Sequence, residues 1–403
     1  MRLLANQHLY HLEHFLPADA KIDRFDPARF PTHAVEYDAL FINTTTKINE
    51  HTLPDAGRLT FIGTGSAGTD HLDEAHLQQL GVRGASAPGC NAQSVAEYVL
   101  MAMLLAAPRP LPRMKVGIIG AGHTGQATQA ILQKLGIKSV FYDPPRAAED
   151  KAFQSASLDD LHQCDLLTVH TPLTVDPPSP TFHMIDGDFL AESRAEVLVQ
   201  ASRGGVVDER AVLFGLKSGR LRAVVTDVWE GEPFFSDELA RHSLVATPHI
   251  AGYSVESKLR ASKMIADAWR RHAGLPPGPE VAEIQEMVEV QDVAEVEKVT
   301  EVEKVTEVEK VIDVFHRTSG DGSFSPNAYP ITDSPLLGSE TARLVAELHP
   351  ILLYDAGLRK LVGRPADEKQ KEFYRLRTET PYRREFSEED WRRIRAVVTE
   401  EKE

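Results

Sequence analysis

The sequence has few cysteines and lacks any long apolar run. Cys90 and Cys164 are its only cysteines; this excludes a disulfide scaffold and a cysteine-built metal site, so we expect two reduced thiols. No apolar run approaches the roughly 18 residues that span a bilayer, and the N-terminus becomes polar too early to contain a secretory h-region. We therefore expect a protein of the cytoplasm.

Positive charge is also scarce. The chain has 44 lysines and arginines against 60 aspartates and glutamates, for a formal net charge of −16. This charge would repel nucleic acid phosphates and anionic lipid surfaces, so neither nucleic acid nor a membrane is an expected partner. The 16 histidines contain no HExxH-like pair, so we predict no metal site. An anionic small molecule would need a local cationic pocket.

The N-terminal part of the chain has the pattern of βα units. With 403 residues, the chain is long enough for two or three domains of about 100 to 200 residues each. Up to about Asn91, short β-rich runs alternate with helix-like stretches, which predicts a parallel sheet. Residues 93–107 then predict one long apolar helix. The expected strands are residues 3–5, 39–43, 60–63 and 82–85.

A second βα series follows this helix. Its strands are rich in Val, Leu and Ile, which is typical of strands buried on both faces in a doubly wound sheet. Asp208 is a candidate N-cap for a helix that ends at Gly219. A helix over residues 254–272 is expected to pack back on the first lobe, which would make that lobe discontinuous. The expected strands are residues 115–119, 139–142, 166–170, 196–201, 222–226 and 244–246.

The chain changes character from Glu280 to Val311. The hexad Glu-Val-Glu-Lys-Val-Thr begins at Glu295 and Glu301, and in part at Glu307. Its valines recur every third residue, which suits neither a strand nor a coiled coil. We expect a solvated charged connector, with a specific interaction surface as the alternative. Helical patterning returns over residues 339–354 and 368–378, and this tail is long enough for a third domain.

A glycine loop carries the first chemical signal. Gly120, Gly122 and Gly125 follow a predicted strand and precede a helix, and Asp143 ends the next strand. This context predicts a dinucleotide site, in which the glycines allow close backbone approach and helix amides face the pyrophosphate. Asp143 would accept hydrogen bonds from the ribose and repel a 2′-phosphate, which favours NAD over NADP. Arg146 is a cation close by, and its alternative role is a surface charge.

Three further side chains can bind a carboxylate and move a proton. Arg203 follows a predicted strand, and its planar fork can hold a carboxylate and polarise the adjoining carbonyl. The alternative for Arg203 is a structural salt bridge. Glu232 could orient His249 and favour its charged form, although a lone histidine is more often structural. Together with the glycine loop, these residues predict oxidation of a hydroxy acid by NAD.

These segments resemble the D-isomer-specific 2-hydroxyacid dehydrogenases. The resemblance rests on the glycine loop, Asp143 and residues 202–208, 227–233 and 248–253, and it covers about residues 1–275. Residues 69–74, 87–92, 143–147 and 250–253 are similar to a narrower group of that family that acts on a phosphorylated hydroxy acid. Weaker similarity at 354–360 and 374–377 extends into that group's C-terminal dimerisation domain.

The resemblance implies a role for each matched residue. Arg203, Glu232 and His249 occupy the catalytic positions. NAD contacts are implied for Gly120, Gly122, His123, Thr124, Gly125, Asp143, Thr171, Asp227 and Gly252. Substrate contacts are implied for Thr44, Ser66 and Tyr253. For residues 44–46 the alternative is a strand end with exposed hydroxyls.

The resemblance also implies an α/β fold of three parts. A doubly wound parallel-sheet (Rossmann) NAD domain would span residues 93–247. A discontinuous, flavodoxin-like catalytic domain would combine residues 1–92 with 248–280. Residues 281–403 would hold the charged connector and a smaller α+β dimerisation domain, so the implied partners are a small phosphorylated hydroxy acid and a second copy of the chain.

Three departures from the family pattern bear on the substrate. Asn43 stands where an arginine able to meet the substrate phosphate is expected, Thr44 replaces a serine, and Gln200 replaces an asparagine. A phosphate buried without positive partners is unfavourable; Lys47 and Arg359 are candidates to supply the charge. The departure at Asn43 keeps open a dehydrogenase of 3-phosphoglycerate or of an unphosphorylated acid. A different alternative is a non-enzymatic NAD-sensing protein, which would not need Arg203, Glu232 and His249 together.

Overall fold

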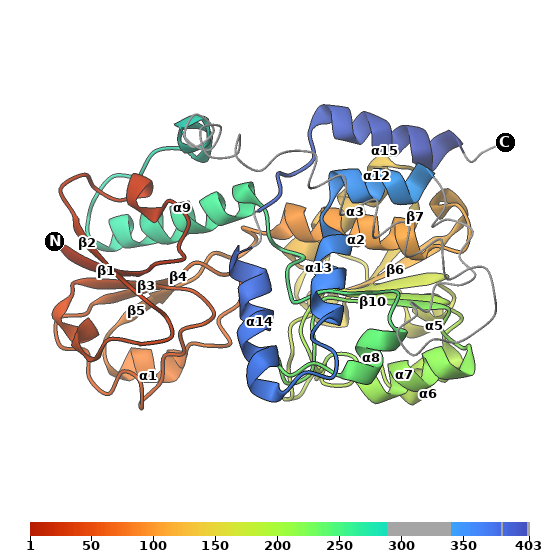
Figure 1. Cartoon of the computed structure of the whole chain (residues 1–403), viewed down its shortest axis with the longest axis horizontal. Helices are drawn as coiled ribbons and strands as arrows, with labels where there is room; N and C mark the ends of the chain where they lie inside the picture. Colours follow the sequence, from red (N-terminus) through yellow and green to blue (C-terminus); the bar gives the residue numbers. More distant parts are fainter. Residues whose placement is uncertain (288–339, 380–381, 401–403) are drawn as a thin grey trace. The chain divides into compact units, whose positions relative to one another are not determined.

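The chain folds into two units, each built on its own parallel sheet (Figure 1). The computed structural model describes residues 1–287, 340–379 and 382–400; the hexad segment lies outside them. Contacts within the chain group Met1–Asn91 with Tyr253–Val299 as the first unit. They group Ala92–Gly252 with Thr300–Glu403 as the second unit.

The first unit contains a five-stranded sheet in the order β2-β1-β3-β4-β5, and every neighbouring pair is parallel. This is the flavodoxin-like order, which confirms the expected topology of this lobe. The four predicted strands are confirmed, but Lys21–Phe25 was missed because its polar, mostly exposed side chains lack an apolar run. The strands are β1 Arg2–Asn6, β2 Lys21–Phe25, β3 Ala39–Ile42, β4 Phe61–Thr64 and β5 Arg83–Ala85.

Helices cover both faces of this sheet. Leu40 and Ile42 of β3 pack in one apolar cluster with Leu77 of α1 (Glu74–Gln79). Phe41 points the other way, because side chains alternate along a strand, and its ring lies 6.3 Å from that of Trp269 in α9 (Val255–His272). The predicted helix over residues 254–272, packed on the first lobe, is thus confirmed (Figure 1).

The second unit contains a six-stranded parallel sheet in the order β11-β10-β9-β8-β6-β7. The chain enters at β6, adds β7 on one side and then crosses to β8 on the other. Such a reversal marks the point where open α/β sheets bind ligands, at the carboxyl ends of the strands. All six predicted strands are confirmed within two residues: β6 Lys115–Ile119, β7 Lys138–Tyr142, β8 Leu166–Val169, β9 Val197–Gln200, β10 Ala223–Thr226 and β11 Val245–Ala246.

Local capping signals set the helices of this unit. Asp208 accepts hydrogen bonds from the amides of Arg210 and Ala211, and Gly219 ends the same helix in the left-handed region, as predicted. The apolar helix expected at residues 93–107 is α2, Ala92–Ala106. The other helices are α3 His123–Lys134, α4 Pro144–Glu149, α5 Leu158–His162, α6 Gly187–Glu192, α7 Glu209–Ser218 and α8 Asp237–His242.

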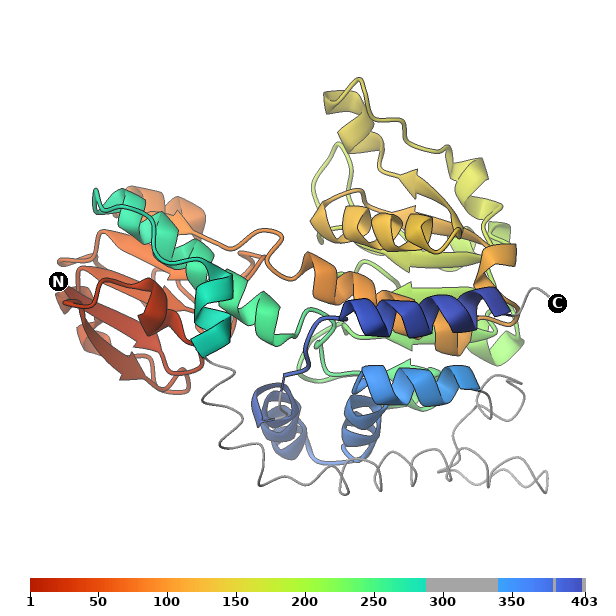
Figure 2. The ribbon, with the colours of Figure 1, turned by 90° about the horizontal axis from the view of Figure 1, so that it is seen from above.

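The described part of the C-terminal tail is mostly helical and packs within the second unit. Leu358, Leu361 and Phe373 are buried in the same apolar core as Trp229 and Phe235. Figure 2 shows these last helices, in blue, beside the larger sheet. They are α12 Glu340–Leu348, α13 Ile351–Arg359, α14 Ala366–Glu379 and α15 Glu388–Glu400; the last was not predicted.

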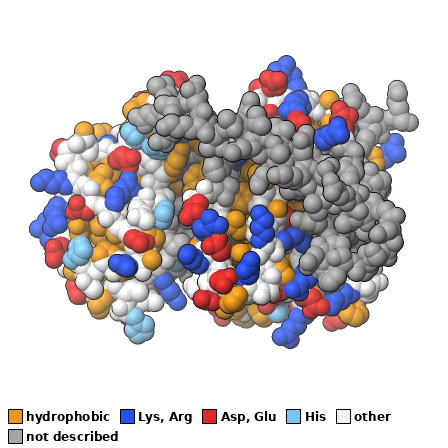
Figure 3. Space-filling model, in the orientation of Figure 1, with side chains coloured by type: hydrophobic (Ala, Val, Ile, Leu, Met, Phe, Trp, Pro, Cys, Tyr) orange, Lys and Arg blue, Asp and Glu red, His pale blue; other side chains and the backbone are white. Residues whose placement is uncertain are grey.

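The surface of the described residues mixes charges of both signs. On the face drawn in Figure 3, Lys and Arg side chains are interspersed with Asp and Glu. Among the described helices, none combines the length and the apolar character needed to cross a membrane.

We predict that both thiols are unreactive in the native protein. Cys90 and Cys164 are buried, and burial raises the pKa of each thiol to about 11. At pH 7.5 only about one thiol in several thousand would be ionised, and the thiolate is the nucleophile. Ellman's reagent should therefore release almost no chromophore from the native protein and about two equivalents after unfolding in guanidinium chloride. Rapid release from the native protein would contradict this.

Candidate active site

The glycine loop joins β6 to α3 through close backbone contacts. Gly120 has φ +95°, and a Cβ there would lie 2.9 Å from the carbonyl carbon of His170. A Cβ on Gly125 would lie 2.0 Å from the carbonyl oxygen of Gly120. Gly122, the N-cap of α3, has open space around it. The first amides of α3, at His123 and Thr124, therefore form an open helix N-terminus, which favours an anionic group.

Asp143 connects this loop to the next strand. One carboxylate oxygen accepts from the amide of Ala121 at 2.8 Å, and the other caps α4 by accepting from the amide of Arg146 at 3.0 Å. The Arg146 guanidinium donates to the carbonyl of Ala121 and lies 4.5 Å from the centre of the Phe153 ring. The sequence analysis gave a surface charge as the alternative role of Arg146. In the structure, Arg146 is hydrogen bonded to the glycine loop.

Thr171 follows β8 and lies against the glycine loop. A Cβ on Gly120 would come within 3.0 Å of its amide nitrogen, so the turns after β6 and β8 touch at the switch point of the sheet. Its neighbour His170 is buried, and burial lowers the pKa of its imidazole to about 3. His170 is therefore neutral at physiological pH.

Arg203 lies in a turn that its own neighbours hold in shape. Gln200, at the end of β9, donates to the carbonyl of Arg203 at 3.0 Å and accepts from the hydroxyl of Ser202 at 3.0 Å. A Cβ on Gly204 would lie 1.8 Å from the carbonyl oxygen of Trp229. The Arg203 turn is thus packed directly on the loop after β10, which carries Glu232. Gln200, which departs from the family pattern, is the residue that shapes this turn.

Glu232 and His249 are in direct contact. The imidazole Nδ1 and a carboxylate oxygen of Glu232 are 2.8 Å apart, and the other carboxylate oxygen accepts from the amide of Trp229 at 3.0 Å. Burial by itself would raise the pKa of Glu232, but the charge and hydrogen bond of His249 outweigh it, with help from the charge of Arg377 and the amide of Trp229. The pKa of Glu232 is therefore below its usual value, so the carboxylate is ionised.

This contact orients the imidazole. With Nδ1 facing a carboxylate, Nε2 is the ring nitrogen that can exchange a proton with a ligand. About a third of the His249 side chain is exposed. His249 has φ +58°, in the left-handed region that non-glycine residues rarely adopt, and its amide donates to the carbonyl of Asp227 at 2.7 Å. The surrounding structure therefore has to hold this residue in place.

Asp227 holds the loop that carries His249. Its buried carboxylate accepts from the hydroxyl of Thr247 at 2.6 Å and from the amides of Ile250 at 2.7 Å and Ala251 at 2.9 Å. Burial raises the pKa of Asp227, although the charge of His249 and these hydrogen bonds oppose the shift. The resemblance implies NAD contacts at Asp227 and at Gly252, and both stay predictions. The carboxylate of Asp227 itself binds a hydroxyl and two amides of the loop after β11.

The three predicted substrate residues all belong to the first unit. Thr44 follows β3 and is exposed, and Ser66 follows the neighbouring strand β4, so both lie at the carboxyl edge of that sheet. The hydroxyl of Ser66 donates to the carbonyl of Gly68 at 2.8 Å. Asn43, where an arginine was expected, shapes a turn: its side-chain oxygen accepts from Asn6 at 3.0 Å and from the amide of Thr45 at 3.1 Å.

A cation that the sequence analysis missed lies beside Tyr253. The ammonium group of Lys258 is 3.5 Å from the centre of the Tyr253 ring, a cation–π distance. The available signal was Ser254, which caps α9 and so places Lys258 in the first turns of that helix.

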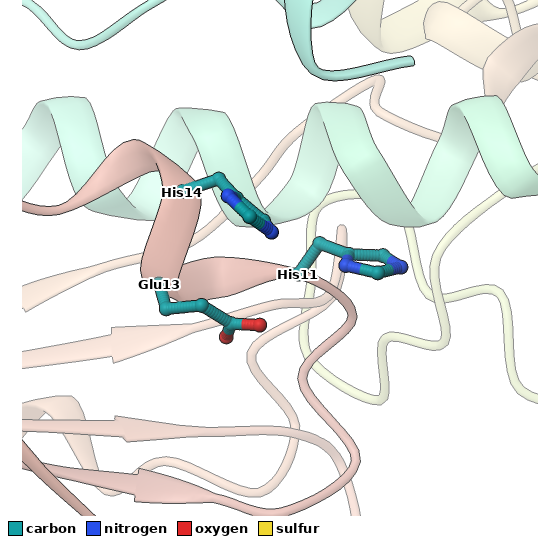
Figure 4. A group of neighbouring side chains, drawn as sticks. All are labelled: His11, Glu13 and His14. Atoms are coloured by element: carbon teal, nitrogen blue, oxygen red, sulfur yellow. The ribbon is translucent and has the colours of Figure 1, made fainter. Parts of the chain in front are cut away.

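Two groups of described residues have ligand-type atoms close together. In Figure 4, His11, Glu13 and His14 gather around a short turn, but the Glu13 carboxylate is paired with Arg24. In the second group, His183, Asp208 and Glu230, the histidine and Glu230 are hydrogen bonded to each other at 2.8 Å, and Asp208 caps α7. Because their carboxylates already have partners within the protein, we assign no metal to either group.

Part of the second unit is similar to a known protein family. Residues 104–251 match the family model described as D-isomer specific 2-hydroxyacid dehydrogenase, NAD binding domain. This stretch is similar to that family's NAD-binding domain. It includes the glycine loop, Asp143, Arg203, Glu232 and His249, so the family resemblance drawn from these residues is confirmed.

Curated proteins of known name are also similar to this chain. Erythronate-4-phosphate dehydrogenases of Escherichia coli O1:K1 / APEC and Escherichia fergusonii are each 44% identical to this chain over 243 residues. Each match covers 59% of this chain and 64% of the relative, a little under two thirds of the relative's length. The chain is thus similar to this narrower group, as the sequence motifs indicated.

Solved structures share the fold. A D-lactate dehydrogenase of Treponema pallidum superposes with a TM-score of 0.56 at 21% identity, covering 68% of this chain and 98% of that chain. An NAD-binding D-isomer specific 2-hydroxyacid dehydrogenase, described as putative, of Polaromonas sp. JS6 66 gives 0.59 at 20% identity, covering 68% and 97%. At this identity the likeness shows the fold alone, and it confirms the predicted α/β class with a doubly wound parallel sheet.

We predict that alanine destabilises the protein at Gly125 but has almost no effect on stability at Gly122. Gly125→Ala should lower the free energy of unfolding by about 1–3 kcal/mol, because the new methyl group collides with the backbone of Gly120. Gly122→Ala is the matched control; its site is open and its backbone extended, so the change should stay within about 0.5 kcal/mol. Urea unfolding followed by circular dichroism measures both. Equal stabilities would show that the contact at Gly125 relaxes freely.

Proposed function

We propose that the protein is an NAD-dependent dehydrogenase that oxidises 4-phospho-D-erythronate to (3R)-3-hydroxy-2-oxo-4-phosphooxybutanoate, a reaction of pyridoxal 5′-phosphate biosynthesis. The observation that carries this proposal is the contact between Glu232 and His249 on a loop packed against the Arg203 turn. The identity of 44% with erythronate-4-phosphate dehydrogenases supports the choice of substrate.

The residues around the glycine loop fit NAD. The open N-terminus of α3 at Gly122 suits a pyrophosphate, and the carboxylate of Asp143 beside it suits ribose hydroxyls. When bound, NAD⁺ would supply the hydride acceptor for the substrate carbon. We propose that it is held by the nine positions given by the family resemblance: Gly120, Gly122, His123, Thr124, Gly125, Asp143, Thr171, Asp227 and Gly252.

The chemistry at the substrate would come from three side chains. Arg203 would bind the substrate carboxylate through its planar fork and polarise the adjoining C2 oxygen. His249 would take the C2 hydroxyl proton at Nε2 while C2 loses hydride, and in the reverse direction it would return that proton. The ionised Glu232 would keep the ring oriented and stabilise the imidazolium that forms.

Recognition of the phosphate is assigned to the first unit. We propose that Thr44, Ser66 and Tyr253 contact the phosphorylated substrate, as the resemblance implies. Asn43 brings no positive charge to this edge. Lys258 on the Tyr253 ring is a candidate cation of the first unit, whereas Arg359 binds Asp355 and backbone carbonyls within the second unit. Lys47, which is exposed in the same segment as Thr44, stays a second candidate.

The assembly and its domains are part of the same proposal. We propose the division into residues 1–92 with 248–280, residues 93–247 and residues 281–403, with a homodimer formed through the last part in the cytoplasm. The similarity of residues 354–360 and 374–377 to the family's dimerisation domain supports it. Light scattering of the purified protein would test for the homodimer. Because Leu358 and Phe373 are fully buried in the second unit, that measurement should use the full chain rather than a truncation.

The substrate assignment is tested by offering three acids. NADH fluorescence should show turnover with 4-phosphoerythronate and not with 3-phosphoglycerate or D-lactate. His249→Ala should lower kcat by about 100-fold or more and leave NAD binding intact. His242→Ala, another histidine of the same unit, is the control.

Other outcomes point elsewhere. Turnover of 3-phosphoglycerate or D-lactate alone would replace the substrate, a possibility that the neutral Asn43 favours. NAD binding without any turnover would point to a sensor. Near wild-type turnover in His249→Ala would remove this histidine from the mechanism.

The charge of Glu232 predicts an effect on the rate. Glu232 has a lowered pKa, so it is ionised throughout the assay range. Glu232→Gln keeps the size of the side chain but places a neutral amide against Nδ1 of His249. Because the amide cannot stabilise the imidazolium that forms when the hydroxyl proton is taken, kcat for oxidation should fall by about 10-fold or more, with KM for NAD unchanged. Wild-type kcat in the folded variant would show that the carboxylate charge is not needed.

A further inference from the structure

His249 follows the edge strand of the larger sheet. Strand β11 has only two residues, Val245 and Ala246, and it pairs with β10 on one side. In the described residues no strand pairs with its other side. Because an edge strand keeps unpaired backbone groups on its free side, something else has to hold β11, and with it the start of the His249 loop.

A buried carboxylate of helix α13 supplies that contact. Asp355 is 1% exposed, and its Oδ1 accepts from the amide of Ala246 at 2.7 Å. The amide it satisfies lies three residues before His249. Burial raises the pKa of Asp355, and the charge of Arg359 opposes the shift. The contact spans 109 residues of sequence, so it joins the C-terminal tail to the strand that leads into the site.

Arg359, one helical turn further on, binds the chain just before β11. Its Nε lies 2.9 Å from both oxygens of Asp355. Its two terminal nitrogens donate to the carbonyl of Ala240, to that of Ser243 at 2.8 Å and to that of Leu244 at 3.3 Å. Residues 240–246 are therefore held by one ion pair from outside the sheet, and residues 247–251 are held by Asp227 from inside.

The C-terminal tail also supports Glu232, which is hydrogen bonded to His249. Phe373 of α14 is fully buried, and its ring stacks on that of Phe235 at 6.3 Å. Phe235 in turn packs on Trp229, whose amide donates to Glu232. Both sides of the Glu232–His249 contact thus rest on helices that follow residue 340.

We propose that Asp355 and Arg359 are positioning residues for His249, which makes α13 part of the catalytic unit of its own chain. This inference rests on the proposed dehydrogenase function. A buried ion pair is weak evidence of stability, because its desolvation offsets its attraction. Here it satisfies four backbone groups next to a histidine in the left-handed region, where a shift of about 1 Å costs about 100-fold in rate.

The test uses a pair of substitutions that keeps the helix packed. Arg359→Met alone leaves a buried, uncompensated carboxylate and endangers folding. The double variant Asp355→Leu with Arg359→Met removes both charges and keeps apolar volume, so it should stay folded. Arg393→Met, which breaks the exposed pair with Glu347 in the same tail, is the matched control.

We expect three results from the full-length proteins. The double variant should lose about 10-fold or more in kcat, while KM for NAD changes by less than about 2-fold. Amide hydrogen exchange in the peptide of residues 244–251 should become faster, with that of β6 unchanged. The single variant Arg359→Lys, which keeps Asp355 and a positive charge, should lose less rate than the double variant. Arg393→Met should behave as wild type.

Other outcomes overturn the inference in distinguishable ways. Wild-type kcat in the folded double variant would leave the dehydrogenase in place and remove the positioning role. A rate loss that only follows the fraction of unfolded protein, with faster exchange throughout the sheet, would reduce the pair to a structural one. If the wild type turns over none of the three acids, the proposed function fails. In that case, unchanged exchange at residues 244–251 in the double variant would show that Asp355 and Arg359 do not hold this segment.

Discussion

The contact between Glu232 and His249 is the interaction on which the rest of the site depends. Burial disfavours the ionised carboxylate of Glu232, and the imidazole of His249 offsets this cost by binding it. The carboxylate in turn fixes the orientation of the ring. The two residues come from loops after β10 and β11, which pair in parallel with Thr226 opposite Ala246. The register of two short strands therefore decides whether the contact between Glu232 and His249 can form at all.

That register needs support, because a two-residue strand has little pairing of its own. Asp227 gives support at the carboxyl end of β10 by binding one hydroxyl and two amides of the neighbouring loop. On the free side, Asp355 takes the amide of Ala246, and Arg359 takes carbonyls of the preceding residues. The hydrogen-bonding needs of the backbone thus explain why three largely buried charged side chains bind the segments of chain around His249.

The sequence predicted the features that local chemistry determines. Apolar strands, the caps Asp208 and Gly219 and the glycine loop each depend on neighbours in the chain, and the structure confirms them. The contact of Glu232 with His249 was a hypothesis that spacing could not establish. Strand β2 was not predicted because its side chains are polar. The contact of Asp355 with β11 was not predicted because no local pattern encodes a contact across more than one hundred residues.

Within the described residues, the β11 edge of the larger sheet is closed by side chains rather than by another strand. A further parallel strand would need its own crossover connection, whereas an open edge invites pairing with other chains. A helix carrying Asp355 and Arg359 satisfies the edge amide and the nearby carbonyls without extending the sheet. The same pair holds the strand that leads to His249. The contacts that satisfy the edge of the sheet therefore also align the imidazole, so a substitution that disturbs the edge should also disturb the position of His249.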